Sequence, residues 1–257
     1  MNIRTSPLIE MAGEAKRPTR WWFAWIVALV IVIGGSAAGS AVGALVLGNP
    51  GEKDTLYQFI EFFSFGATLI LLFLWVRFKE SRPFSSIGFR GRNPIGKLLL
   101  GFVIGAAMMT IGVIAPWALG HYVTSGSVHT NVGSAALGAL IPLVIVFLLQ
   151  ASTEEAVFRG YLLQVTGSQT NALIAIIGTS VFFAVIHTDF RPIVLTNITL
   201  YAVFACFVAL GQGNLWLIAD CTRAGTTSRA TSMDSPSAVT LRPPPCSRSA
   251  PRPDPVT

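Results

Sequence analysis

The sequence is poor in charged residues and in the residues that build metal or disulfide frameworks. Only 12% of its 257 residues are Asp, Glu, Lys or Arg, whereas 52% are hydrophobic, and the mean hydropathy is +0.63. A single soluble core could not bury so much apolar surface, so the composition excludes an ordinary soluble domain. The three cysteines are Cys206 in an apolar run and Cys221 and Cys246 near the C-terminus. Their spacing excludes a paired-cysteine metal motif and a disulfide framework.

The hydrophobic residues are gathered into runs of about 20, the length needed to cross about 30 Å of hydrocarbon as a helix. Strands of a membrane barrel would alternate polar and apolar residues instead. The sequence therefore predicts an all-α fold, a polytopic transmembrane helix bundle of about six to seven spans. We expect spans at about Trp21 to Leu47, Leu56 to Val76, Leu98 to Leu119, Ala135 to Gln164, Ala172 to His187 and Ile193 to Leu210, with a truncated seventh beginning near Leu215.

Basic residues flank the first two runs. Arg4, Lys16, Arg17 and Arg20 precede the first run, and six further Lys or Arg residues fill the loop from Arg77 to Lys97. Since such residues are enriched in cytoplasmic segments, we expect a cytoplasmic N-terminus in an integral protein of the plasma (inner) membrane. The formal charge of +6 then reflects contact with lipid headgroups, and nucleic acid is excluded as a partner. The first run is too long for a cleaved signal peptide.

The chain divides into four segments by composition. Residues 1–20 form a cytoplasmic N-terminal segment. Residues 21–94 form two spans and the basic loop, in which Pro83 to Phe89 indicates a short interfacial stretch. Residues 95–219 form a membrane core. Residues 220–257 are rich in Ser, Thr, Arg and Pro and have few aliphatic residues, so we expect a disordered tail.

Three charged residues occur together inside the fourth span, although each costs about 2.5 to 3.5 kcal/mol to insert. Glu155 and Arg159 are spaced i,i+4 on a helix, so their side chains meet on one face and can neutralise each other. Glu154 is turned about 100° from its neighbour and points elsewhere. These positions predict a structural ion pair between Glu155 and Arg159 and a free carboxylate at Glu154 that can act as a general base.

The fifth span ends in Phe183 and His187, which share one helical face. Measured from the polar turn near Ser168, Glu154 and His187 lie at depths that differ by about five residues, or ~7 Å of helical rise. Helix tilt and side-chain reach can absorb that difference. We therefore expect the carboxylate of Glu154 and the imidazole of His187 to converge within the membrane.

These residues resemble the CAAX-protease and bacteriocin-processing family, which includes CAAX prenyl proteases and lysostaphin-resistance proteins. Its members carry a Glu-Glu-x-x-x-Arg motif, a Phe-x-x-x-His motif and a later His-x-x-x-Asn/Asp motif on separate transmembrane helices. This sequence matches the first motif within STEEAVFRGYL and the second within VFFAVIH. The resemblance extends over roughly residues 95 to 219.

The resemblance implies an intramembrane metallo- or glutamate-type endopeptidase. Glu154 would activate a water for attack on a peptide carbonyl, and His187 would orient that water or ligate a divalent metal. Zinc is the expected ion, with Glu154 as a second candidate ligand. Glu155, Arg159 and Phe183 would support the site. The expected partners are a peptide or protein substrate, either prenylated or a membrane peptide, and the lipid bilayer.

The third family motif is missing. After the segment Gly213 to Leu217 the chain reads Ile-Ala-Asp-Cys-Thr-Arg, without histidine or asparagine. One imidazole and one carboxylate are fewer ligands than the roughly three that hold a catalytic zinc. Codons for Asp220 to Thr227, read from their third base, can encode Leu-His-Ala-Gly-Trp-Asn-Tyr, which contains the missing motif. We therefore expect a frameshifted tail and an impaired enzyme; the alternative is a non-enzymatic membrane scaffold or bacteriocin-immunity-type protein that retains the fold.

Overall fold

The chain folds as a bundle of helices, as its hydrophobic runs predict. The computed structural model describes residues 5–48, 57–120, 122–124, 134–218 and 239–241. The helices run in the order α1 (Pro7–Glu10), α2 (Trp21–Leu47), α3 (Tyr57–Leu74), α4 (Pro94–Ala118), α5 (Ser134–Glu155), α6 (Leu163–Gln169), α7 (Thr179–Ile186) and α8 (Pro192–Gln212). The all-α prediction is confirmed; the described strands are β1 (Tyr122–Thr124) and β2 (Val239–Leu241), which pair antiparallel.

Short irregular helical stretches link or extend these helices. There are 3₁₀ turns over Met11–Glu14 and Phe84–Ile87. Wider π-helical stretches occupy Trp75–Lys79, Ala156–Leu162 and Ile174–Gly178. Through the second π-helical stretch, α5 continues into α6 without a break, so one long helical segment runs over residues 134–169.

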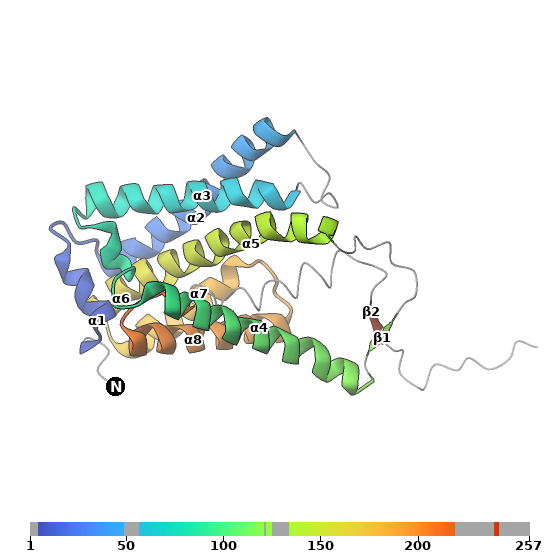
Figure 1. Ribbon diagram of the computed structural model, residues 1–257. Helices are drawn as coiled ribbons and strands as arrows, with labels where there is room; N and C mark the ends of the chain where they lie inside the picture. The colour runs from blue at the N-terminus through green and yellow to red at the C-terminus, as the bar shows by residue number, and fades with distance from the viewer. Residues whose placement is uncertain (1–4, 49–56, 121, 125–133, 219–238, 242–257) are drawn as a thin grey trace, which may run out of the picture.

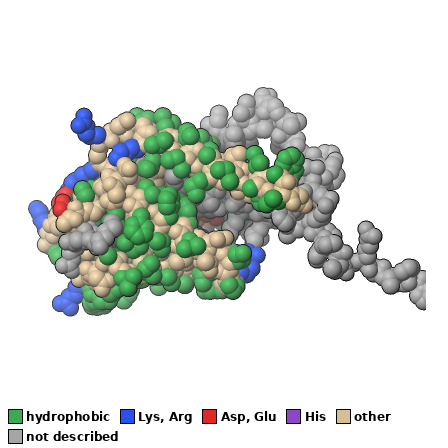
Figure 2. Space-filling model, turned by 90° about the horizontal axis from the view of Figure 1, so that it is seen from below, with side chains coloured by type: hydrophobic (Ala, Val, Ile, Leu, Met, Phe, Trp, Pro, Cys, Tyr) green, Lys and Arg blue, Asp and Glu red, His purple; other side chains and the backbone are tan. Residues whose placement is uncertain are grey.

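Among the described residues, four helical segments are long and apolar enough to cross a membrane: Trp21–Leu47, Tyr57–Lys79, Pro94–Ala118 and Pro192–Gln212, with a shorter apolar helix at Ile174–Ile186. Large hydrophobic side chains remain exposed along them, for example Val30 at 61% and Ile70 at 60%. Figure 2 shows such side chains spread over one face of the molecule, with Lys and Arg at its margins. This distribution is that of a protein whose outer surface meets lipid, and the chain is an integral membrane protein.

The helices form two groups that meet at the long segment α5–α6. Figure 1 shows α2 and α3 side by side, with α5 next to α3, and α7 beside α8. The α2–α3 contact is close because Gly39 leaves no room for a Cβ against the backbone of α3 at Phe63. Ser40 and Ser64 form a hydrogen bond of 2.8 Å across the same contact. Such small and hydroxyl-bearing residues are what membrane helices use to pack tightly.

The end of the bundle that carries the N-terminus is closed by a buried charge pair. Glu80 and Arg82 are at most 1% exposed and form an ion pair of 2.7 Å. Glu80 also accepts a hydrogen bond of 2.6 Å from the hydroxyl of Thr19, and Arg82 donates one of 2.8 Å to Gln164. The basic loop is therefore tied to both the N-terminal segment and α6, so the two basic regions lie at one end of the bundle, as their charge predicted.

Within the stretch from Pro83 to Phe89, which the sequence predicts to be interfacial, the central residues Ser86 to Gly88 are buried in the protein. Gln164 donates a hydrogen bond of 3.0 Å to the carbonyl of Ser86, which satisfies a backbone group that would otherwise need water. A Cβ at Gly160 would approach the carbonyl oxygen of Ile87 to 2.5 Å. The loop backbone can approach the helix this closely because residue 160 is glycine, which has no Cβ.

Candidate functional site

The first family motif lies where the long α5–α6 segment changes its winding. Glu154 and Glu155 are the last two residues of α5, and the π-helical stretch begins at Ala156. π-Helical stretches are rare and are often found at functional sites, because they turn side chains out of the regular helical register. The residues of this stretch from Ala156 to Leu162 are all buried, so the motif is set inside the bundle.

Glu155 and Arg159 form the ion pair that their i,i+4 spacing predicts. The distance from Arg159 Nη1 to Glu155 Oε1 is 3.0 Å, and the two side chains are 0% and 1% exposed. Two opposite charges buried together satisfy each other, whereas either one alone would be an uncompensated charge inside the protein. The charge of the Glu155 carboxylate is therefore balanced by Arg159.

The second motif meets the first through Arg159. The guanidinium carbon of Arg159 lies 4.4 Å from the centre of the Phe183 ring. Phe158 packs edge-on against the same ring at 4.9 Å, and the imidazole of His187 at 4.6 Å. A guanidinium over an aromatic face is attracted by the ring quadrupole. Phe183 therefore links α7 to the motif on α5.

His187 ends α7 with its ring held in one orientation. Its Nδ1 lies 2.7 Å from the carbonyl oxygen of Phe183. Because a carbonyl can only accept, Nδ1 must donate this hydrogen bond. A neutral His187 then carries its lone pair on Nε2, the atom that can accept a proton or bind a metal.

Glu154 has a different environment from Glu155. Its side chain is partly exposed, and Gln150, one turn earlier, donates a hydrogen bond of 3.2 Å to its Oε1. It lies close enough to Arg159 for their charges to interact, although the ion pair of Arg159 is with Glu155. Of the two adjacent carboxylates, Glu154 is the one whose side chain is not fully enclosed by the protein.

Sequence reasoning missed a further carboxylate, Glu61 on α3. Its charge interacts with that of Glu154, and the two helices touch where Thr153 donates a hydrogen bond of 3.4 Å to the carbonyl of Phe65. A single acidic residue within the apolar run of the second predicted span was the available signal, because charged residues inside spans are expensive. The second predicted span therefore contributes an acidic side chain on the helix that packs against α5.

The expected convergence of Glu154 with His187 remains a prediction. The hydrogen bond of Glu154 is with Gln150, and the contact that joins the two motifs is that of Arg159 with Phe183. Within the described ranges, no three His, Cys, Asp or Glu side chains are grouped so that they could hold a metal ion. The donors that the structure describes are thus too few for a zinc site of about three protein ligands.

The described residues that directly follow α8, 213–218, contact the loop that follows α3. Gly213 has a left-handed φ of +64°, and the amide of Leu215 donates a hydrogen bond of 3.0 Å to the carbonyl of Gly88. The expected position of the third motif, and all of the predicted tail except Val239–Leu241, lie outside the described residues.

These features define a class of protein: a helical membrane bundle with a Glu-Glu-x-x-x-Arg motif and a Phe-x-x-x-His motif in contact. Residues 136–219, about a third of the chain, match the family described as type II CAAX prenyl endopeptidase Rce1-like. This segment is similar to that family, and it contains Glu154, Glu155, Arg159, Phe183 and His187. No curated protein and no solved structure matches the chain.

Proposed function

We propose that this chain derives from a membrane endopeptidase in which Glu154 activates the water that hydrolyses a peptide bond. The observation that carries the proposal is the difference in environment between two adjacent glutamates. Glu155 is 0% exposed and paired with Arg159, whereas Glu154 is partly exposed and accepts a hydrogen bond from a neutral amide. A carboxylate that is not neutralised by a buried cation keeps the basicity that proton abstraction from water needs.

His187 has a supporting role in this proposal. Since Nδ1 donates to Phe183, Nε2 is the atom that can accept a hydrogen bond from the attacking water. The Arg159–Phe183 contact fixes the α7 end that carries the imidazole. Arg159 and Phe183 are thus positioning residues, and Glu154 and His187 are the groups that would touch the water.

A divalent metal, with zinc the family's expected ion, would require a further ligand in addition to His187 and Glu154. The donors present in the described residues do not meet that requirement, and no step of the proposed mechanism depends on a metal. The proton of the water goes to Glu154, the oxygen bonds to the peptide carbonyl carbon, and the C–N bond breaks as Glu154 passes that proton to the leaving amine.

We further propose that this copy is impaired. The family's third motif is replaced by the segment that begins at Asp220, and the shifted reading frame can encode a His-x-x-x-Asn motif at that place. Removing one donor that stabilises the developing oxyanion commonly lowers turnover by about 10² to 10³. A non-enzymatic membrane scaffold or bacteriocin-immunity-type protein is the second candidate, and the absence of the third motif from the sequence after Leu217 favours it.

An isotope experiment on the frame-restored chain tests the role of Glu154. In a single turnover in ¹⁸O-labelled water, a general base delivers the label to the new C-terminus of the product. A nucleophilic Glu154 would instead form an anhydride with the new C-terminus, and water that attacks the Glu154 carbonyl would leave label in the Glu154 side chain and the unlabelled Glu154 oxygen in the product. Labelled product with an unlabelled Glu154 supports the proposal, and label in the Glu154 side chain contradicts it.

A further inference from the structure

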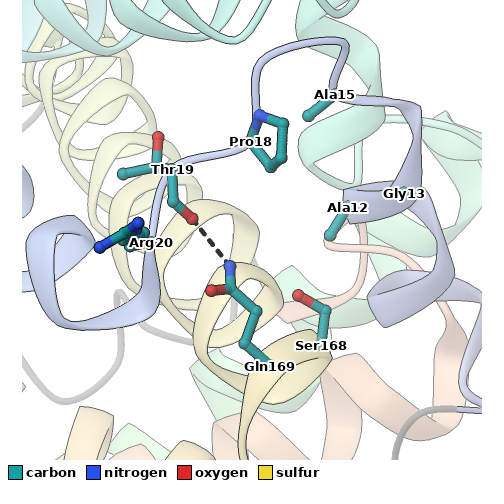
Figure 3. Close-up of a pocket in the computed structure, with 8 residues that line it drawn as sticks. All are labelled: Ala12, Gly13, Ala15, Pro18, Thr19, Arg20, Ser168 and Gln169. Carbon is teal, nitrogen blue, oxygen red and sulfur yellow. Dashed lines mark hydrogen bonds between the residues drawn. The ribbon is translucent and has the colours of Figure 1, made fainter.

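A small cavity lies at the end of the bundle where the N-terminal segment passes under α6. Its volume is about 290 Å³. Figure 3 shows the N-terminal segment forming one wall and the last residues of α6 the other. We call it the Arg20 pocket; it is lined by Ala12, Gly13, Ala15, Pro18, Thr19, Arg20, Ser168 and Gln169.

The walls of the Arg20 pocket are held together by hydrogen bonds. Gln169 donates one of 2.7 Å to the carbonyl of Thr19, the bond drawn in Figure 3, and accepts one of 3.0 Å from the amide of Trp21. The hydroxyl of Thr19 is in turn bonded to the buried Glu80. The backbone on both sides of Arg20 is therefore fixed before any ligand binds, which lowers the entropy lost on binding.

The rim of the Arg20 pocket is cationic. Arg20 lines the pocket, and the exposed Lys16 and Arg17 lie between the lining residues Ala15 and Pro18 in the chain, with no acidic residue between Lys16 and Arg20. Among the ion pairs of the described residues, none involves these three cations, whereas the neighbouring Glu14 is paired with Arg90. An anion at this rim would find unpaired positive charge and would displace no existing partner.

The pocket also lies at the depth of the lipid headgroups. Arg20 immediately precedes α2, which begins a candidate membrane span at Trp21. The first side chains of that span are aromatic and exposed, with Trp21 at 38% and Trp22 at 49%. Tryptophan is enriched at the level of the headgroups, which places the adjacent guanidinium of Arg20 where lipid phosphates are found.

Further along α2 from Trp22, exposed apolar side chains form a strip. Ile26, Val30 and Ile33 are 49%, 61% and 59% exposed, and their spacing puts them on one side of the helix. An acyl chain can lie against such a strip while the headgroup stays at the helix end. The cavity itself is at the lower limit of ligand pockets, which span about 300 to 1,000 Å³, so it has the size for a headgroup and not for the acyl chains.

We propose that the Arg20 pocket binds the phosphate headgroup of an anionic phospholipid from the leaflet that α2 enters. The guanidinium of Arg20 presents a planar pair of donors that matches two phosphate oxygens, which a lysine ammonium cannot reproduce. The lipid joins the N-terminal segment to α6 and α2, so binding stabilises this end of the bundle. The site is independent of the proposed peptidase chemistry, because none of its residues belongs to the Glu154 site.

The test uses the full chain reconstituted in phosphatidylcholine nanodiscs with and without phosphatidylglycerol. The measurements are the shift in melting temperature that phosphatidylglycerol causes and the phosphatidylglycerol retained after extraction and detected by native mass spectrometry. Arg20→Gln removes the guanidinium, and Ala12→Leu fills the cavity without changing the charge. Arg92→Gln is the matched control, because Arg92 is an exposed cation at the same end that does not line the pocket.

The proposal predicts stabilisation and lipid retention in the unmodified chain and in Arg92→Gln, loss of both in Arg20→Gln and Ala12→Leu, and partial retention in Arg20→Lys. Melting in pure phosphatidylcholine shows whether a variant is folded, and lipid retention is compared only among folded variants. If Arg92→Gln lost as much lipid as Arg20→Gln, or if Ala12→Leu retained all of it, the lipid would be held by diffuse surface charge. Either result would overturn the proposal that the pocket binds it. Equal stabilisation by inorganic phosphate in detergent would identify a free phosphate site and overturn the lipid assignment.

Discussion

The buried pair Glu155–Arg159 makes a quantitative prediction about stability. Both side chains are at most 1% exposed, and removing one partner of such a pair typically costs about 3 to 5 kcal/mol because the other charge stays buried. Domains are stable by only about 5 to 15 kcal/mol. Glu155→Ala and Arg159→Ala should therefore each remove a large part of the stability, with Arg159→Ala also losing its contact with Phe183.

Glu154→Ala should be far milder. It removes a hydrogen bond from a neutral amide, and such bonds contribute about 0.5 to 1.5 kcal/mol. The expected order of damage is Arg159→Ala, then Glu155→Ala, then Glu154→Ala. A double variant, Glu155→Leu with Arg159→Met, removes both charges and should be less damaging than either single alanine variant.

The assay follows the melting of detergent-solubilised protein by fluorescence-detected size exclusion, with a fluorescent protein fused to the N-terminus, and records membrane yield in parallel. If Glu154→Ala lowered the melting temperature and the yield most, the assignment of the two glutamates would be reversed. If the double variant were as damaging as the sum of the singles, the two residues would not act as a pair.

Two further predictions concern topology and packing. The loop 77–97 should be cytoplasmic, so a cysteine at Arg92 should react with a membrane-impermeant reagent only after permeabilisation; labelling from outside intact cells would reverse the topology. Gly160→Ala should lower the free energy of unfolding by about 1 to 3 kcal/mol, and with it the melting temperature. The reason is that its Cβ would lie 2.5 Å from the Ile87 carbonyl oxygen. Gly211→Ala, whose Cβ would meet nothing within 4 Å, is the control, and an equal effect there would rule out the close contact as the cause.

Local patterns in the sequence predicted the parts of the fold that depend on nearby residues. The run from Trp21 to Leu47 gives a helix with those ends, because a long apolar stretch in a membrane must satisfy its backbone internally. The i,i+4 spacing of Glu155 and Arg159 likewise gives their ion pair. Both features are set by helix geometry alone.

Features that depend on distant segments could not be predicted in the same way. Arg82 was counted with the topology-determining cations of its loop, yet it is buried against Glu80 and Gln164. Its partner Gln164 is 82 residues away, and sequence periodicity carries no information about such a contact. The proximity of Glu61 to Glu154 depends in the same way on how α3 packs on α5.

The central claim is that Glu154 is the base of a peptidase whose third motif this chain lacks. The direct measurement is cleavage of a fluorogenic peptide library in proteoliposomes that contain the unmodified chain, the chain with the reading frame restored after Ala219, or the restored chain with Glu154→Gln. We expect cleavage by the restored chain, a rate at least about 10²-fold lower for the unmodified chain, and no activity above background with Glu154→Gln. Equal rates for the unmodified and restored chains, or activity that survives Glu154→Gln, would contradict the claim.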